Sequence, residues 1–300
     1  MVFTSFDQLI EENRKKQARK TVAVVCAEDA HTLHAVMTAG KDGVAKPLLI
    51  GDEAKIRELV KEYEGYCDYS IIPADDNSDA LNTTLELVRS GQADAIMKGR
   101  IETAELMRMV VSQESGLRTG ELMSHMLVVK IPNYHKLICM SDVALVTYPD
   151  VEQKKQIILN TVGVLKGIGF SDIKVAVLAA VDKVNPKMPE SVDAAELKKM
   201  NQAGEIPDCI VEGPISYDLA IDPESARIKG YQSPVAGDAD MLLCPNITAG
   251  NILVKSLVFS GNAIAGGIVI GAKVPVILTS RASSTDEKYR SVVLAASVNT

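Results

Sequence analysis

A hydroxyl, a guanidinium and two carboxylates lie close together near the end of this chain of 300 residues. The apolar run 274–278 stops at Ser280 and Arg281, and the acidic residues Asp286 and Glu287 follow shortly after. An arginine can stabilise developing negative charge, and a carboxylate can accept a proton from a nucleophile. A strand that looks buried and ends on such groups predicts a ligand-binding cleft at its tip.

A second group of polar residues follows an earlier apolar run, in the stretch ADAIMKGRIETAEL (93–106). Lys98 and Arg100 flank Gly99 at the carboxyl end of an expected strand, directly before a helix that begins near Thr103. In an open α/β sheet ligands bind at this end, and free helix N–H groups beside two cations suit a phosphate. A solvated turn in which Gly99 serves only the geometry fits equally well, so the spacing leaves both interpretations open.

A third stretch, SGLRTGELMSH (115–125), places Arg118 and Thr119 between two glycines. Glycines let the backbone approach a ligand closely, and an arginine can bind a phosphate through two parallel hydrogen bonds. A flexible hinge with a surface arginine fits the same pattern. His125, at the end of this stretch, is interpreted as a structural residue beside an apolar strand rather than as a base.

A fourth stretch, GDADMLLCPNITAGNILVKSL (237–257), predicts a strand, a Pro-Asn turn and a helix. Asn251 and Lys255 are one helical turn apart and are expected to face a ligand together. Asp238 and Asp240 are a weak metal signal, because no histidine or glutamate accompanies them, and we expect no metal site. The GxSxG, P-loop, GxGxxG and HExxH motifs are absent from the sequence.

Short apolar runs recur along the chain, and they predict the strands that position these groups. Most runs are continuous rather than alternating, which is typical of strands covered by helices on both faces. Helical patterns lie between them, and this order predicts an α/β fold with mostly parallel sheets flanked by helices. The expected strands are 21–26, 47–50, 69–72, 93–97, 126–131, 137–140, 174–181, 209–211, 241–243 and 274–279, and the expected helices include 54–64, 78–90, 150–166 and 188–202.

The chain is expected to form two lobes. Two strands follow each other across a turn at Pro132–Asn133 without room for a helix, so a boundary is placed just before them. The last strand is expected to return to the first lobe. This gives a discontinuous first lobe of residues 1–121 plus 268–300 and a second lobe of residues 122–267, with the active site in the cleft between them.

The composition excludes several classes of protein. A formal net charge of −7 gives no overall attraction to nucleic acid or to anionic membranes, so any phosphate site must be local. No signal peptide is recognisable, and no uncharged run reaches the roughly 18 residues of a membrane span. The five cysteines form no CxxC pair and indicate neither disulfides nor zinc. A cytoplasmic protein without nucleic-acid or membrane partners is therefore expected.

Four stretches together resemble the phosphate acetyl/butyryltransferase family, and most closely its butyryl branch. They are GLRTGELMSH, EGPISYDLAID, AGDADMLLCPNITAGNILVKSL and LTSRASSTDEK, and they are collinear with the family over nearly the whole chain. The resemblance implies a two-lobed fold similar to isocitrate and isopropylmalate dehydrogenases, usually as a homodimer. It also implies transfer of a short-chain acyl group, butyryl, between coenzyme A (CoA) and inorganic phosphate. Acyl-CoA and phosphate are then the substrates, and no tightly bound cofactor is expected.

The same resemblance implies roles for individual residues. In acetyl members a Ser-Arg pair followed by an acidic residue ends the last strand, and these look like Ser280, Arg281 and Asp286. Asp286 would deprotonate the CoA thiol, Arg281 would stabilise the carbonyl oxygen, and Ser280 would hydrogen-bond the leaving phosphate or sulfur. Butyryl members read SRADS in this loop whereas this chain has Ser283, so Asp286 and Glu287 both stay open as the base. The residues expected to bind the substrates are Lys98, Arg100, Arg118, Thr119, Asn251 and Lys255.

Several alternative functions stay open. A phosphate acetyltransferase differs from a butyryltransferase only in a few methylenes of its substrate, and the sequence identifies no pocket wall. An NAD-dependent dehydrogenase of the isopropylmalate type would share the fold, but it needs an aspartate cluster for a divalent metal, and none is evident. An enzyme that makes long-chain acyl phosphates would need a basic docking face. A noncatalytic binding protein would have no need of the Ser-Arg-acid combination.

Overall fold

The structure is a computed structural model in which residues 2–280 and 283–299 are described. The chain divides into two compact units. The split unit comprises residues 6–121 and the residues from Gly266 onward. The inserted unit comprises residues 122–265 together with the residues up to Ser5.

The N-terminal residues up to Ser5 lie in the inserted unit, whereas the sequence predicts one lobe from residues 1–121. Phe3 is buried, and the centroid of its ring lies 5.0 Å from that of Phe170. Its carbonyl oxygen accepts a hydrogen bond from the backbone N–H of Leu137 at 2.7 Å. These partners are distant in sequence, so no local pattern indicates the contact.

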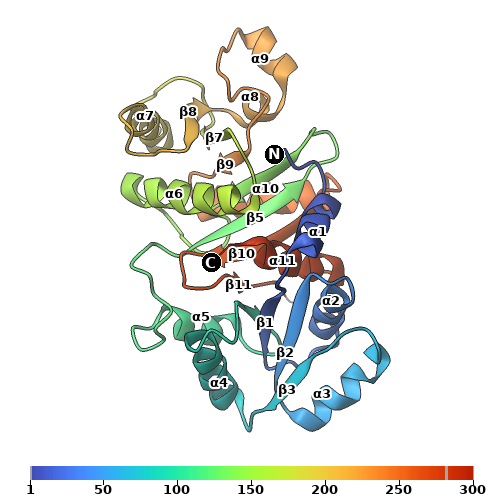
Figure 1. The fold of residues 1–300 in the computed structure, drawn as a ribbon. Coiled ribbons are helices and arrows are strands. Elements are labelled where there is room, and N and C mark those ends of the chain that lie inside the picture. Colours follow the sequence, from blue (N-terminus) through green and yellow to red (C-terminus); the bar gives the residue numbers. More distant parts are fainter. Residues whose placement is uncertain (1, 281–282, 300) are drawn as a thin grey trace. The chain divides into compact units, whose positions relative to one another are not determined.

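The split unit contains a mainly parallel sheet (Figure 1). Its strands are β1 (Lys20–Val25), β2 (Ala45–Gly51), β3 (Ser70–Pro73), β4 (Ala95–Lys98), β10 (Ile264–Ile270) and β11 (Val276–Ile277). Their order is β3-β2-β1-β4-β11-β10, and β10 pairs with β11 in the antiparallel direction. The run 22–25 of β1 is fully buried, as predicted for a strand covered on both faces.

Helices cover this sheet, and several begin at a polar capping residue. The helices are α1 (Phe6–Lys15), α2 (Ala30–Lys41), α3 (Glu53–Val60), the short 3-10 helix η1 (Lys61–Tyr63), α4 (Asn77–Arg89), α5 (Thr103–Val111) and α11 (Thr285–Ser297). Asp29, Asp52 and Asp76 accept hydrogen bonds from backbone N–H groups in the first turns of α2, α3 and α4, which fixes where these helices begin. The C-terminal helix α11 packs against α1 and α2 (Figure 1).

Strand β10 is an element that the sequence does not predict. The pair Gly266–Gly267 lies in its interior, and glycine weakens a strand there. A Cβ atom on Gly266 would lie 2.8 Å from the backbone carbonyl carbon of Arg290, so only glycine permits this approach of α11. The backbone N–H of Gly267 donates to Ser291 Oγ at 2.9 Å. The helix that carries the acidic residues is therefore held directly against β10.

Within the described residues, the inserted unit contains five strands, with helices packed on them. Its strands are β5 (Ser124–Lys130), β6 (Leu137–Ser141), β7 (Ile173–Leu178), β8 (Cys209–Ile215) and β9 (Met241–Leu243), and its helices are α6 (Val151–Ile168), α7 (Pro189–Gln202), α8 (Tyr217–Ile221), α9 (Pro223–Lys229) and α10 (Ile247–Phe259). The strand order is β5-β6-β9-β7-β8. Strands β5 and β6 pair in the antiparallel direction across the predicted turn, and the other neighbours are parallel.

The α/β class with mostly parallel strands is confirmed in both units. Most expected strands agree with the observed ones to within a few residues, but β11 spans only Val276–Ile277 instead of 274–279. Among the helices of the described residues, none combines the length and the apolar character needed to cross a membrane.

Candidate active site

The last strand of the split unit ends in the predicted polar tip. Thr279 is buried and Ser280 is exposed, so the chain reaches the surface directly after β11. The carbonyl oxygen of Ser280 accepts a hydrogen bond from the backbone N–H of Ser283 at 3.0 Å. Arg281, which is predicted to stabilise the reacting carbonyl oxygen, lies outside the described residues.

The two acidic residues of the tip lie in different surroundings. The half-buried Glu287 accepts a hydrogen bond from Ser283 Oγ at 2.8 Å. Asp286 is exposed and lines a cavity of about 470 Å³ together with residues of α1 and α2, among them Arg14 and His34. Glu287 is therefore bonded to Ser283, whereas Asp286 faces the first two helices.

Lys98 and Arg100, which are close in sequence, also have different neighbours. Lys98 is 7% exposed at the end of β4, and its charge acts on the ammonium group of Lys288 in α11. Arg100 is exposed and lines another cavity, of about 320 Å³, with the carboxylates of Glu28 and Asp76. The structure therefore places Lys98 with the residues that follow β11 and Arg100 in acidic surroundings.

The turn between Lys98 and Arg100 requires a glycine because two strand ends approach closely. A Cβ atom on Gly99 would lie 2.6 Å from the carbonyl oxygen of Val25, and it would also overlap that of Cys26. The backbone N–H of Arg100 donates to the same Cys26 carbonyl at 2.6 Å. Any side chain at position 99 therefore forces the turn away from β1.

Replacing Gly99 with alanine is expected to destabilise the protein by about 1–3 kcal/mol, the usual range for forced overpacking. The displaced turn carries Lys98, so binding of phosphate, the ligand expected for this lysine, should weaken as well. Chemical denaturation followed by circular dichroism measures the loss. Gly163 in α6 has open space around it, so Gly163→Ala is a matched control that should keep or raise stability. A Gly99→Ala protein as stable as the wild type would show that the turn shifts without strain.

Lys288 is a cation near the tip that the sequence analysis misses. It is 7% exposed, and its Nζ donates to Thr279 Oγ1 at 2.9 Å. Burial lowers the pKa of Lys288, the carboxylates of Asp29 and Glu287 oppose this shift, and Lys98 adds to it. A lysine in the first turn of a charged helix is usually a surface residue, so the sequence carries no signal that distinguishes it.

The glycine-bracketed loop is fastened to the turn that precedes β11. Arg118 pairs with Ala272 in an isolated antiparallel bridge. Thr119 Oγ1 donates to the carbonyl oxygen of Gly271 at 2.7 Å and accepts from the backbone N–H of Glu121 at 3.2 Å. The Thr119 hydroxyl thus serves the loop geometry, while the exposed Arg118 can reach a ligand.

Asn251 and Lys255 lie in the inserted unit, on α10. The side chain of Asn246 caps this helix, which begins at Ile247. Asn251 Nδ2 donates to the carbonyl oxygen of Val143 at 3.3 Å, and Lys255 is exposed. The predicted spacing of one helical turn is present, but Asn251 already has a backbone partner.

The contacts of His125 agree with its interpretation as a structural residue. Its backbone N–H donates to Asp142 Oδ2 at 2.7 Å, and the side chain is buried. Burial lowers the pKa of His125, and Asp142 opposes this shift only in part. The imidazole is therefore neutral near neutral pH, as expected for a structural residue.

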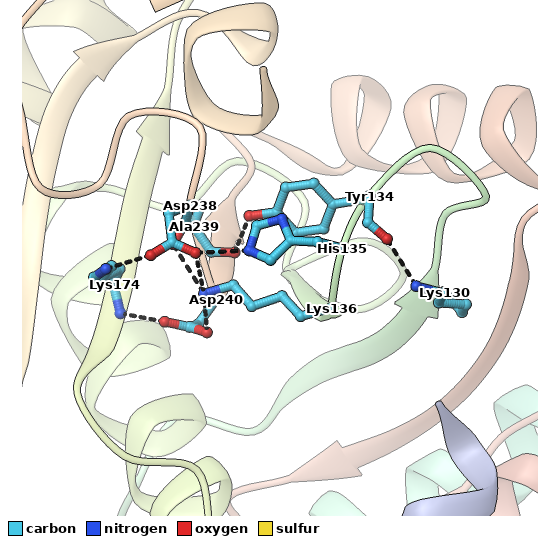
Figure 2. A network of polar contacts seen from close by, with 8 residues as sticks. All are labelled: Lys130, Tyr134, His135, Lys136, Lys174, Asp238, Ala239 and Asp240. Atoms are coloured by element: carbon cyan, nitrogen blue, oxygen red, sulfur yellow. Dashed lines mark hydrogen bonds and ion pairs between the residues drawn. The ribbon is translucent and has the colours of Figure 1, made fainter. Parts of the chain in front are cut away.

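Asp238 and Asp240 bind lysines rather than forming a metal cluster (Figure 2). Lys136 Nζ lies 2.9 Å from Asp238 Oδ1 and 2.6 Å from Asp240 Oδ1, and Lys174 also pairs with Asp238. His135 Nε2 lies 2.8 Å from Asp238 Oδ1. Across residues 2–280 and 283–299, no group of three or more His, Cys, Asp or Glu side chains is arranged to hold a metal ion.

Replacing Asp238 with asparagine is expected to reduce the loss of unfolding free energy at acidic pH. Burial alone would raise the pKa of Asp238, but hydrogen bonds from lysines 174 and 136 and from His135 outweigh it and hold the pKa at about 2. The folded pKa lies below the unfolded one, so this carboxylate stabilises the fold above about pH 4, and that contribution is lost as the pH falls toward 2. Because solvent reaches the side chain, we expect a contribution of about 1 kcal/mol.

Urea denaturation at about pH 6 and about pH 3 measures this effect. The difference in unfolding free energy between the two pH values should shrink in Asp238→Asn. The exposed Glu64 is a suitable control position, and Glu64→Gln should keep the wild-type difference. An unchanged pH difference in Asp238→Asn would mean that other carboxylates carry the acid sensitivity.

Comparison with known proteins gives one consistent result. Residues 73–296 match the family described as Phosphate acetyl/butaryl transferase. The chain is 41% identical over 295 residues to the phosphate butyryltransferase of Clostridium acetobutylicum, with 98% of each chain covered. It is 40% identical over 290 residues to the phosphate acetyltransferase of Thermotoga maritima, with 97% of this chain and 98% of the relative covered.

A solved structure agrees with these sequence matches. The branched-chain phosphotransacylase from Enterococcus faecalis V583 has a TM-score of 0.83 and 31% identity, and the match covers 93% of this chain and 98% of that one. The alternative of an isopropylmalate-type dehydrogenase is not supported by these comparisons, and the expected likeness to isocitrate dehydrogenase stays a prediction. Given a family match over most of its length and relatives of this identity over nearly all of it, the chain belongs to the phosphate acetyl/butaryl transferase family.

Proposed function

We propose that the protein transfers a butyryl group between CoA and inorganic phosphate. The observation that carries the proposal is the 41% identity to a phosphate butyryltransferase over 98% of both chains. Ser280 and Glu287, each bonded to Ser283, offer the hydroxyl and carboxylate that such a reaction needs. Acyl-CoA and phosphate are the substrates, and no tightly bound cofactor is expected. The cytoplasmic location stays a prediction.

The proposed reaction is a direct displacement at the acyl carbon. The thiolate sulfur of CoA attacks the carbonyl carbon of the acyl phosphate, and a tetrahedral oxyanion forms. The bond to the phosphate oxygen then breaks with its electron pair. A thiol with a pKa of about 8.5 is only a few per cent ionised at neutral pH, so a general base raises the rate. Arg281 would stabilise the oxyanion, and Ser280 would hydrogen-bond the leaving phosphate or sulfur.

We propose Glu287 as the base, with Asp286 as the alternative. What supports Glu287 is its 2.8 Å hydrogen bond from Ser283, whose backbone is in turn bonded to the carbonyl of Ser280. The resemblance to the Ser-Arg-acid pattern supports Asp286, but that side chain lines the cavity with Arg14. Ser283 stands where butyryl members have an aspartate, and it gives the loop a hydrogen-bond donor that holds Glu287.

Cations near the strand ends would hold the phosphate groups. Lys98 at the end of β4 and the exposed Arg118 are proposed as ligands of the phosphoryl group. Arg100 and Lys255 are exposed and are proposed as ligands of the phosphates of CoA. Thr119 and Asn251 both donate to backbone carbonyls. Their proposed contribution to binding is therefore indirect: Thr119 fixes the loop that carries Arg118, and Asn251 fixes the helix that carries Lys255.

A homodimer is also part of the proposal. Ile252 and Phe259 on α10 are 61% and 78% exposed, and Gly250 is the one buried residue among the 13 of this helix. An apolar helix face of this kind is typical of a surface covered by a second subunit. Sedimentation velocity should show a dimer for the wild type and a shift toward monomer for Phe259→Ser. A dimer that persists in this variant would argue against α10 as the interface.

Release of free thiol tests the reaction. Phosphate-dependent release from butyryl-CoA, followed with a thiol reagent, is expected at a higher rate than release from acetyl-CoA. The reverse order would favour a phosphate acetyltransferase, the activity named for the 40% identical relative from Thermotoga maritima. Thiol release from neither substrate would contradict the proposal.

A further inference from the structure

The chain buries an ammonium group directly behind the polar tip. Lys288 is 7% exposed, and its Nζ donates to the neutral hydroxyl of Thr279 at 2.9 Å. An ammonium group has three N–H donors, so this bond leaves two for other acceptors. Among the described residues, Lys288 takes part in no ion pair.

The nearby carboxylates are engaged elsewhere. Asp29 accepts from the backbone N–H of Thr32 at 2.8 Å and from its hydroxyl at 2.5 Å. Glu287 accepts from Ser283 at 2.8 Å. Both attract Lys288, yet the pKa of Lys288 is still lowered, because burial is the largest effect. A buried cation is normally paired, and here the protein alone compensates the charge incompletely.

A second buried lysine lies at the same end of the sheet. Lys98 ends β4 and is 7% exposed. Strand β4 is the parallel neighbour of β11, with Met97 in register with Ile277, so Lys98 lies beside the exit of β11. Its charge is one of the causes that lower the pKa of Lys288, as expected of an ammonium group beside the end of β11. Two neighbouring buried cations suit a ligand with two negative charges.

We propose that Lys288 binds the reacting phosphoryl group together with Lys98, as inorganic phosphate in one direction and as acyl phosphate in the other. This inference rests on the proposed function and adds a ligand to that site. The phosphoryl group is favoured over the nucleotide phosphates of CoA because Lys288 is bonded to Thr279, the residue directly before Ser280. The group that Ser280 would contact is therefore the one within reach of Lys288.

The dissociation constant of inorganic phosphate, measured by calorimetry on the full chain without CoA, tests the inference. Lys288→Met keeps the apolar stem but removes the charge, and it should weaken phosphate binding about 10- to 100-fold. Lys288→Arg keeps the charge and should stay within a few-fold of wild type. Lys61 has a side chain that is 70% exposed, and Lys61→Met should bind phosphate as the wild type does.

A purely structural role for Lys288 predicts a different pattern. Thr279→Val removes the acceptor of the buried hydrogen bond but keeps the ammonium group. If the bond only fastens α11 to β11, Thr279→Val and Lys288→Met should lower the melting temperature alike and leave phosphate binding unchanged, which would overturn the inference. We expect instead that Thr279→Val loses stability but keeps phosphate affinity within a few-fold.

The wild-type protein gives a test that needs no variant. Phosphate affinity should fall as the pH rises through the lowered pKa of Lys288, because the ammonium loses its proton there. The charged groups that face it are Lys98 on β4, Asp29 at the start of α2, and Glu287 on α11, and His31 in turn acts on Asp29. In Lys288→Arg the alkaline loss should move to higher pH, since a guanidinium stays charged. An identical alkaline limb in both proteins would assign it to another group.

Two further measurements distinguish inorganic phosphate from the phosphates of CoA as the ligand of Lys288, and distinguish a failure of this inference from a failure of the proposed function. Binding of free CoA to Lys288→Met should equal that of wild type; a loss of CoA binding with intact phosphate binding would place a nucleotide phosphate at Lys288 and overturn the inference. If wild type releases no thiol from butyryl-CoA but its phosphate binding depends on Lys288, the proposed function fails and the phosphate site stands. If the wild-type protein releases thiol from butyryl-CoA and Lys288→Met binds phosphate normally, the proposed function stands and the phosphate site at Lys288 fails.

Discussion

Replacing Glu287 with glutamine is expected to lower turnover at neutral pH by roughly 10²- to 10⁴-fold, the range of a lost general base. Glutamine can still accept the hydrogen bond from Ser283 Oγ that Glu287 receives at 2.8 Å, so the turn should keep its shape. The defect should be partly rescued at higher pH, where CoA ionises without help. Turnover of butyryl-CoA with phosphate, measured as thiol release across the pH range, gives both results.

Asp286→Asn is the matched comparison, because it removes the neighbouring carboxylate. Asp286 is exposed and lines a cavity with Arg14 and His34, so this variant should keep turnover within a few-fold of wild type. If Asp286→Asn is the crippled variant and Glu287→Gln remains active, the base is one residue earlier than the hydrogen bonding indicates. Full activity of both variants at every pH would place the proton acceptor outside this loop.

Replacing Arg281 with alanine is expected to lower turnover at least about 100-fold, the scale of a lost donor to a developing oxyanion. The charge on the carbonyl oxygen grows only in the transition state, so the loss should fall on kcat more than on KM. Lys273 is an exposed cation in the turn before β11, and Lys273→Ala should leave turnover unchanged. A selective rise in the KM for phosphate in Arg281→Ala would make this residue a substrate clamp instead.

The parts of the fold that the sequence predicts are those with a local signal. The apolar run at 22–25 predicts β1, and the run 241–243 coincides with β9. Strand β10 has no such signal, because Gly266 reads as a break in a strand and its reason, the backbone of Arg290, lies on another element. The position of Phe3 in the inserted unit is likewise decided by contacts that are distant in sequence.

The residues of the candidate site can likewise be predicted from the sequence only where a local pattern marks them. Ser280 and the acidic pair can be predicted because a buried run stops at polar residues, and the hydrogen bond between Ser280 and Ser283 keeps the two segments close. The sequence cannot separate Asp286 from Glu287, since adjacent residues at the start of α11 point in different directions and the neighbours of each come from other segments. Lys288 carries no signal of its own, because its burial depends on contacts outside its own helix, among them the hydrogen bond to Thr279.

The order of strands in the split unit affects how the protein is made. Strand β11 comes from the last part of the chain, yet it lies between β4 and β10. While the ribosome synthesises the inserted unit, β4 has an open edge whose unpaired N–H and C=O groups can associate with other chains. The helices α1 and α2 also lack a packing partner until α11 is synthesised, because α11 packs on both. The nascent chain therefore passes through a long period in which misassociation competes with folding, and a chaperone bound during translation would protect the open edge.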